Sequence, residues 1–352
     1  MRVLESTAKD TRKTALRSPM DPRFRALEAW LGTVLPGAVR RIEPASADAS
    51  FRRYFRAILE DGTTRIVMDA PPEREASTPQ FVRIAALIRE AGLNAPQVFE
   101  QDLAQGFLLL ADLGTTSYLA ALQAGSPDAL FGDATTALVR WQAASRPGVL
   151  PEYDEAMLRR EMELFPDWYI GRHLGMELAA SQRESLESVF RIVLANNLAQ
   201  PRVFVHRDFM PRNLMVSRPN PGILDFQDAT FGPIGYDIAC LFRDAYVSWD
   251  EERVLDGTIR YWEKARRAGL PVRADFAHFW RDVEWMGLQR HLKVAGIFAR
   301  LAHRDGKRGY VEDTPRFIGY LRHAVSRYDE LAPLGRLLDN LEGVKPRIGY
   351  TF

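Results

Sequence analysis

The chain has 352 residues, of which 46% are apolar and 26% charged. This mix is typical of a folded globular protein, and the length suffices for about two domains. The 47 basic and 46 acidic residues nearly cancel, so no broad positive field favours binding to nucleic acid or to an anionic membrane surface.

The sequence also lacks the signs of a secreted or membrane-bound protein. Cys240 is its single cysteine, which excludes an internal disulfide and a cysteine-based metal cluster and fits a reducing compartment. No apolar run approaches the roughly 18 residues of a membrane-spanning helix, and residues 1–20 lack the apolar segment of a secretory signal. We therefore expect a cytoplasmic protein whose residues 1–20 form a disordered tail.

The first part of the chain combines β-rich runs with one helical pattern. Residues 40–72 predict three strands, and Asp61-Gly62 between two of them is a strong signal for a hairpin turn. Residues 79–91 carry apolar side chains three and four positions apart, which predicts an amphipathic helix that Gly92 ends. Two more β-rich runs follow, PQVFEQD and GFLLLADLG. The predicted order is therefore β-β-β-α-β-β.

The rest of the chain is mostly helical in its pattern. Residues 181–184, Ser-Gln-Arg-Glu, form a capping-box pattern that predicts the start of a helix. Further helical patterns cover residues 236–248, 252–268, 275–301 and 316–331. We expect an α+β protein in which a small β-rich lobe is joined to a larger, mostly helical lobe.

One stretch carries an informative set of polar residues. His206, Arg207 and Asp208 are followed by Asn213 five positions after the aspartate, and Asp225 ends a later apolar run. This spacing, H-R-D-x-x-x-x-N followed by D-F, is typical of a kinase catalytic loop. The tripeptide alone means little, but the whole combination in this order is rarely accidental.

These residue types match the needs of phosphoryl transfer. The acceptor hydroxyl needs a carboxylate that takes its proton, and Asp208 fits that role. Mg²⁺ on the nucleotide phosphates needs oxygen ligands, which Asn213 and Asp225 would supply. We expect the apolar runs beside them to hold the three side chains at the edge of one rigid hairpin.

With these motifs the chain resembles the aminoglycoside phosphotransferase/choline kinase superfamily, whose members share a bilobal protein-kinase-like fold. Residues 106–114, GFLLLADLG, are similar to the segment that joins the two lobes in that superfamily, and residues 233–239, PIGYDIA, are similar to another of its motifs. The resemblance covers nearly the whole chain. It implies a nucleotide-binding lobe over residues 21–113 and a catalytic, sugar-binding lobe over residues 114–352. It also makes Asp237 a buried acceptor that braces the catalytic loop.

Longer peptides resemble one branch of the superfamily, the bacterial kinases that phosphorylate the anomeric C1 hydroxyl of N-acetylmuramate and N-acetylglucosamine in peptidoglycan recycling. These peptides are HRDFMPRNLM, LDFQDATFGPIGYDIACLF and IVMDAPPE. The resemblance implies a sugar kinase that depends on ATP and Mg²⁺. In such an enzyme Asp208 is the catalytic base, Asn213 and Asp225 hold Mg²⁺, and the backbone of Asp112 and Leu113 receives adenine.

Two alternatives stay open at this point. The acceptor can be another small alcohol, such as an aminoglycoside or choline, although cationic acceptors favour an acidic pocket and the catalytic region is balanced and rich in arginine. The protein can also be a pseudokinase that binds ligands without turnover. N-acetylmuramate carries a lactyl carboxylate that an arginine could pair with, which favours the amino sugar. The sequence leaves the oligomeric state open.

The sequence departs from related kinases at the residues that hold the phosphates. It has no lysine between Lys13 and Lys264, and Asp69 occupies the place of the lysine that such kinases carry on the third strand. The usual pair of that lysine with a glutamate on the following helix is therefore missing. This absence is the main support for the pseudokinase alternative.

Arginines offer a replacement for the missing lysine. Arg52, Arg53 and Arg56 lie on the second predicted strand, and arginine suits bidentate contacts with phosphate. Side chains alternate along a strand, so Arg52 and Arg56 share one face and Arg53 takes the other. The preceding loop lacks the glycines of a kinase phosphate loop. We expect Ser50, Phe51 and Arg53 to contact the nucleotide.

Overall fold

A computed structural model describes residues 21–47, 51–123 and 127–343. The expected tail over residues 1–20 and the expected nucleotide contact Ser50 lie outside the described residues. Among the described helices, none is long and apolar enough to cross a bilayer.

Contacts between Cα atoms divide the chain into two units. The first unit runs to Thr115 and also contains Val216–Gln227, while the second contains Thr116–Met215 and the chain from Asp228 onward. The first cut falls close to the expected limit after residue 113. The expected larger lobe, residues 114–352, includes Val216–Gln227. The structure places this segment in the first unit instead, because its contacts are with that unit.

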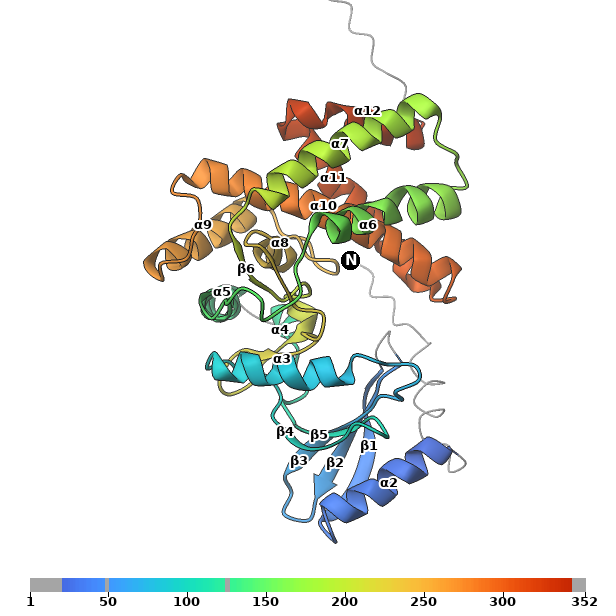
Figure 1. The fold of residues 1–352 in the computed structure, drawn as a ribbon, viewed down its shortest axis with the longest axis vertical. Coiled ribbons are helices and arrows are strands. Elements are labelled where there is room, and N and C mark those ends of the chain that lie inside the picture. The colour runs from blue at the N-terminus through green and yellow to red at the C-terminus, as the bar shows by residue number, and fades with distance from the viewer. Residues whose placement is uncertain (1–20, 48–50, 124–126, 344–352) are drawn as a thin grey trace, which may run out of the picture. The chain divides into compact units, whose positions relative to one another are not determined.

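The first unit is built on a five-stranded antiparallel sheet with the strand order β1-β2-β3-β5-β4 (Figure 1). Its elements are β1 (Val39–Ala47), β2 (Arg53–Leu59), β3 (Thr64–Asp69), α3 (Thr78–Glu90), β4 (Val98–Asp102) and β5 (Phe107–Ala111). This is the order that the sequence predicts. The α+β class, with a β-rich part and a mostly helical remainder, is confirmed.

One helix of this unit, α2 (Pro22–Val34), was not predicted. Its signals are present in the sequence: the Asp21 side chain caps the helix start, and Leu27, Trp30 and Leu31 recur three and four positions apart. These apolar residues join a core with side chains of the sheet, namely Phe55, Ala57, Leu59, Val67, Phe107 and Leu109. Helix α2 therefore packs against the sheet of the first unit.

Gly106 makes the sharp turn between β4 and β5, at the start of the GFLLLADLG motif. Its φ is +76°, and a Cβ there would lie 1.9 Å from the carbonyl oxygen of Ala70. The Ala70 N–H donates to the Gly106 carbonyl at 2.8 Å, so the two backbones must approach closely. Only glycine fits this position.

The second unit is mostly helical (Figure 1) and contains a short antiparallel pair, β6 with β9. Its helices are α4 (Tyr118–Leu122), α5 (Pro127–Ala143), α6 (Glu155–Leu164), η1 (Phe165–His173), α7 (Ala180–Leu198), η2 (Pro211–Asn213), α8 (Tyr236–Phe242), α9 (Glu251–Arg267), α10 (Phe276–His303), η3 (Arg308–Asp313), α11 (Thr314–Arg327), η4 (Asp329–Leu331) and α12 (Ala332–Leu341). Its strands are β6 (Arg202–Val205), β7 (Leu214–Met215) and β9 (Thr230–Pro233). Helices α9, α10 and α11 follow the predicted pattern closely.

Two predicted helix limits in this unit are wrong. Helix α7 begins before Ser181, and the Gln182 side chain accepts the backbone N–H of Ala179 at 2.9 Å, so Gln182 rather than Ser181 supplies the cap. Helix α8 ends at Phe242 instead of near residue 248. The Asp244 carboxylate accepts two backbone N–H groups just beyond it, and this local turn competes with the helix.

Candidate active site

The loop that carries the predicted catalytic residues leaves β6 and is fixed by Asp237 on α8. The Asp237 carboxylate is fully buried and accepts the backbone N–H of His206 at 2.7 Å and of Arg207 at 2.9 Å. Burial raises the pKa of Asp237 to about 7, although both hydrogen bonds oppose that shift. The predicted bracing role of Asp237 is confirmed.

The backbone turns sharply at Arg207, which has a φ of 76° in the left-handed region that residues other than glycine seldom adopt. Beyond this turn the Asp208 carbonyl accepts two hydrogen bonds, from Met210 N–H at 2.9 Å and from Asn213 Nδ2 at 3.0 Å. Asp208 and Asn213 thus share one closed loop in the second unit. The side-chain amide of Asn213 is oriented by the backbone next to the predicted base.

A buried ion-pair network in the second unit holds the side chain of Arg207. Glu161 on α6 pairs with the Arg207 guanidinium and with the Lys293 ammonium, which lies 3.0 Å from its Oε1. Gln289 and the hydroxyl of Tyr153 also donate to Glu161. Burial disfavours the charged carboxylate, but Lys293 and Arg207 lower the pKa of Glu161 to about 2. This network was not predicted from the sequence.

Asp225 lies in the first unit, shortly after β8 (Gly222–Ile223). Its φ of 62° is also in the left-handed region. Gln227 Nε2 donates to Asp225 Oδ1 at 2.9 Å, and the buried ring of Phe226 lies 4.8 Å from the ring of Phe81 on α3. Packing of the D-F motif therefore fixes the turn that presents Asp225.

Arg52, in the first unit, interacts electrostatically with Asp225. Its side chain is 5% exposed, pairs with Glu75 at 3.2 Å and donates to the hydroxyl of Ser77. Burial opposes the charge of Arg52, but Tyr54, Glu75 and Asp225 raise its pKa above the ordinary value. A buried cation thus lies in the electrostatic field of the predicted metal ligand.

At the position of the missing lysine, this chain carries a negatively charged side chain instead of a positively charged one. Asp69, at the end of β3, is fully buried; Arg53 Nε donates to its Oδ2 at 2.9 Å and Arg23 Nε to its Oδ1 at 3.2 Å. Arg53 pairs with Asp21 as well. The nucleotide contact of Arg53 stays a prediction, and these two carboxylate partners favour Arg52 over Arg53 for that role.

The segment expected to receive adenine follows β5. Arg56 holds the Asp112 carboxylate with two nitrogens, and that carboxylate also accepts the Gly114 N–H at 2.9 Å. Burial raises the pKa of Asp112, but these contacts outweigh it and lower the pKa. Leu113 is therefore held between two anchored residues. The adenine contact itself stays a prediction.

The loop before β2 offers one described candidate for nucleotide contact. Phe51 is 57% exposed, and the Arg74 guanidinium lies 4.3 Å from the centre of its ring. Such an exposed aromatic side chain suits stacking, and the Arg74 guanidinium already lies over its ring. The role of Phe51 stays a prediction.

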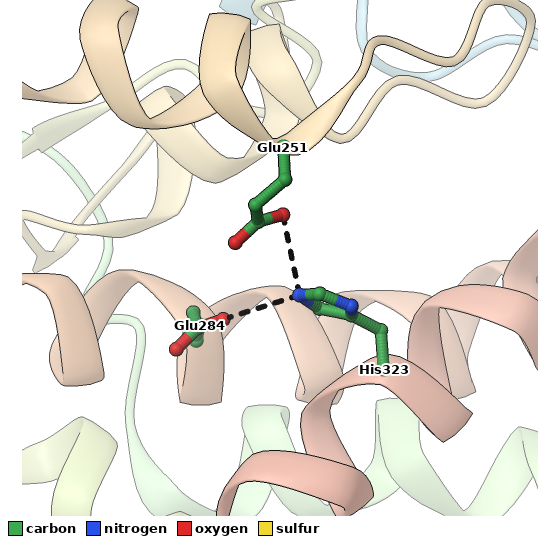
Figure 2. A group of neighbouring side chains, drawn as sticks. All are labelled: Glu251, Glu284 and His323. Atoms are coloured by element: carbon green, nitrogen blue, oxygen red, sulfur yellow. Dashed lines mark ion pairs between the residues drawn. The ribbon is translucent and has the colours of Figure 1, made fainter.

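A separate cluster of Glu251, Glu284 and His323 in the second unit was not predicted (Figure 2). Its ligand atoms lie within 4.8 Å of one another, which is close enough to share a metal ion. Arg327 already pairs with both glutamates at 2.8 Å, and Arg243 pairs with Glu251. Two guanidinium groups balance two carboxylates, so the cluster is an ion-pair network that joins α9, α10 and α11.

Comparison with known proteins assigns the chain to a family. Residues 41–276 match the phosphotransferase enzyme family. The chain belongs to that family. Its members transfer phosphate groups, which agrees with the catalytic-loop residues described above, and the protein is a phosphotransferase of the kinase type.

Relatives of the same family are similar over almost their whole length. An N-acetylmuramate/N-acetylglucosamine kinase of Pseudomonas aeruginosa is 52% identical over 331 residues, which cover 91% of this chain and 97% of that protein. A protein of the same name from Neisseria meningitidis is 50% identical over 331 residues and covers 93% of this chain and 98% of its own. Another from Caulobacter vibrioides is 30% identical over 340 residues.

Solved structures of the family share the fold. An aminoglycoside phosphotransferase solved with ADP superposes with a TM-score of 0.59 at 14% identity, covering 85% of this chain and 98% of that one. An aminoglycoside 2'-phosphotransferase solved with GDP gives a TM-score of 0.60 at 14% identity, covering 87% and 100%. The expected protein-kinase-like fold is thereby confirmed.

Proposed function

We propose that the protein transfers the terminal phosphate of ATP to the anomeric C1 hydroxyl of N-acetylmuramate and N-acetylglucosamine. The observation that carries this proposal is the braced loop of Asp208, Asn213 and Asp237, found in a chain that is 52% identical to a kinase named for these two sugars. Such a reaction suits a cytoplasmic enzyme of peptidoglycan recycling.

In this proposal Asp208 accepts the proton of the C1 hydroxyl. The sugar oxygen forms a bond to the γ-phosphorus, the bond from that phosphorus to the bridging oxygen breaks, and ADP leaves. An anomeric hydroxyl is more acidic than an ordinary alcohol, so a carboxylate is a sufficient base. The hydrogen bonds that close the loop hold Asp208 in place, which limits the motion lost on reaching the transition state.

The predicted metal ligands have the chemistry that Mg²⁺ prefers. Asn213 offers an amide oxygen, and its Nδ2 is already engaged with the Asp208 carbonyl, so Oδ1 is the ligand atom. Asp225 offers a carboxylate whose Oδ1 is steadied by Gln227. When bound, Mg²⁺ would supply positive charge that stabilises the phosphate oxygens. Asp112 and Leu113 would bind adenine through their backbone.

Arg52 is proposed to supply the positive charge that the third-strand lysine gives in related kinases. Its pair with Glu75 just before α3 parallels the pair of that lysine with a helix glutamate. Arg53 and Arg56 are less suited to the role, because Arg53 pairs with two carboxylates and Arg56 holds Asp112 with two nitrogens, whereas Arg52 pairs with Glu75 through one.

We expect Arg52→Gln to raise the KM for ATP by about 10- to 100-fold, because a charge-assisted contact contributes about 1.5–3 kcal/mol. The KM for the sugar should change little, and Arg52→Lys should restore part of the ATP affinity. Both constants are measured by steady-state kinetics, with thermal unfolding to confirm that each variant is folded. Arg53→Gln is the matched control; if it alone weakens ATP binding, the assignment to Arg52 is wrong.

The function itself is tested by ADP release from the purified protein with Mg²⁺ and ATP. N-acetylmuramate and N-acetylglucosamine should both stimulate release, and phosphorus NMR of the products should show phosphate on C1. Turnover with choline or an aminoglycoside but neither amino sugar would favour the other acceptor class. No stimulation by any of the four would favour a pseudokinase.

A further inference from the structure

The catalytic loop carries a second arginine, Arg212, whose surroundings differ from those of Arg207. Arg212 lies in η2, directly before Asn213 and four residues after Asp208. Four residues of extended chain span no more than about 14 Å, so the Cα atoms of Arg212 and Asp208 lie within that distance. All of these residues belong to the second unit.

The partners of Arg212 are uncharged. Its Nη1 donates to the hydroxyl of Tyr246 at 2.7 Å, its guanidinium carbon lies 5.1 Å from the centre of the same ring, and Tyr310 also forms a hydrogen bond with it. Burial raises the pKa of Tyr246 to about 12, so that hydroxyl does not neutralise a cation at neutral pH. Over the described part of the chain, no carboxylate comes within 4.0 Å of Arg212.

Three other cations of the second unit are paired with carboxylates, whereas Arg290, which contacts Met210 of the same loop, is buried and donates to the Arg243 carbonyl at 3.3 Å. Arg207 and Lys293 share Glu161, and Arg243 pairs with Glu251. A half-buried arginine that lacks a carboxylate among the described residues retains unbalanced positive charge. An anionic group of the substrate would balance it, since a partly buried charge is costly to leave unpaired.

The side chains around Arg212 are held rigidly enough to position it. The ring of Phe298 is buried and lies 6.3 Å from the ring of Tyr246 and 5.1 Å, edge to face, from that of Tyr310. The Tyr246 backbone N–H is fixed by the Asp244 carboxylate at 2.7 Å. Both tyrosines are half-buried, so they offer aromatic surface of the kind that stacks on sugar rings.

We propose that Arg212, held by Tyr246 and Tyr310, binds the lactyl carboxylate of N-acetylmuramate and so determines how strongly the enzyme prefers that sugar over N-acetylglucosamine. The inference rests on the proposed function. The two sugars differ by this lactyl ether on O3, on the same ring as the C1 hydroxyl. A cation that recognises the carboxylate must therefore lie close to the group that receives the C1 proton, and Arg212 is carried by the same short loop, four residues after Asp208.

The test combines substitution of Arg212 with removal of the substrate charge. For the wild-type protein, kcat/KM is measured with N-acetylmuramate, with the neutral amide of its lactyl group and with N-acetylglucosamine. We expect the wild type to prefer the acid over the amide by about 10- to 100-fold, the effect of one charge-assisted contact. Arg212→Gln should use acid and amide equally well, and Arg212→Lys should keep part of the preference.

Arg322→Gln is the matched control, because Arg322 pairs with Asp339 at 2.8 Å and Glu342 at 2.6 Å and should leave the acid-to-amide ratio unchanged. If Arg212→Gln and the wild type show the same ratio, the proposal is overturned, whatever happens to total activity. If Arg212→Gln does not fold, the neutral variant Arg212→Met replaces it, and an acid-to-amide ratio equal to that of the wild type overturns the proposal in the same way. A wild-type protein that phosphorylates neither sugar refutes the proposed function, and this inference with it.

Discussion

Asp208→Asn should lower kcat by about 10²–10⁴-fold while the protein remains folded and still binds ATP. The asparagine keeps the size of the side chain but cannot accept the proton of the C1 hydroxyl, so the contribution of general base catalysis is lost. The hydrogen bonds that close the loop use the Asp208 carbonyl and are unaffected by the substitution. Turnover is measured by ADP release and ATP affinity by calorimetry.

Asp225→Asn distinguishes the loss of a metal ligand from the loss of the catalytic base. As a proposed Mg²⁺ ligand, Asp225 should be needed for metal-dependent ATP binding as well as for turnover. We therefore expect Asp225→Asn to lose both, whereas Asp208→Asn loses turnover alone. Normal turnover in Asp208→Asn would contradict the role of the base, and unchanged Mg·ATP affinity in Asp225→Asn would contradict the role of the ligand.

Glu161→Gln should lower the free energy of unfolding by about 3–5 kcal/mol, the usual cost of leaving buried charges without their partner. The amide would leave the Arg207 guanidinium and the buried Lys293 ammonium without a counter-charge. Glu163→Gln on the same helix is the control. Glu163 pairs with Arg159 at 3.3 Å on the surface, and its loss should cost no more than about 1 kcal/mol. Urea unfolding measures both values.

The same network should make stability depend on pH. The pKa of Glu161 is lowered to about 2 in the folded protein, below its ordinary value of 4.5. A carboxylate with a lowered pKa stabilises the fold above its ordinary pKa, and this stabilisation is lost as the pH falls from about 4.5 towards 2. The wild type should lose stability over that range more steeply than Glu161→Gln. Parallel unfolding curves at pH 5 and pH 3 would contradict this.

Local sequence signals were sufficient for most of the first unit. The Asp61-Gly62 turn is present between β2 and β3, where Gly62 has a φ of +81° and the Asp61 carboxylate accepts the Thr63 N–H at 2.8 Å. Helix α3 follows the apolar pattern that predicted it. Turns and amphipathic helices depend on residues that are close together in the chain, so the sequence alone is sufficient to predict them. Helix α2 carries comparable local signals, namely the Asp21 cap and the apolar residues Leu27, Trp30 and Leu31.

The ion-pair partners of the site could not be predicted in this way. Asp69 pairs with Arg53, 16 positions away in the sequence, and with Arg23, 46 positions away. Glu161 pairs with Arg207, which is also 46 positions away. Such partners depend on how strands and helices pack, and one sequence does not specify that packing. The motif residues Asp208 and Asn213 were identified because their spacing along the chain is itself the signal.

The buried Asp69 with its two arginines has a consequence for how this phosphotransferase can evolve. Asp69→Lys would place a third positive charge against Arg23 and Arg53 in a position with no exposure to water, so a single substitution cannot restore the usual kinase lysine. Replacing either arginine first would deprive the buried carboxylate of a partner. Each first step is unfavourable, so the three positions are epistatic, and a lysine at position 69 requires that Arg23 and Arg53 change as well.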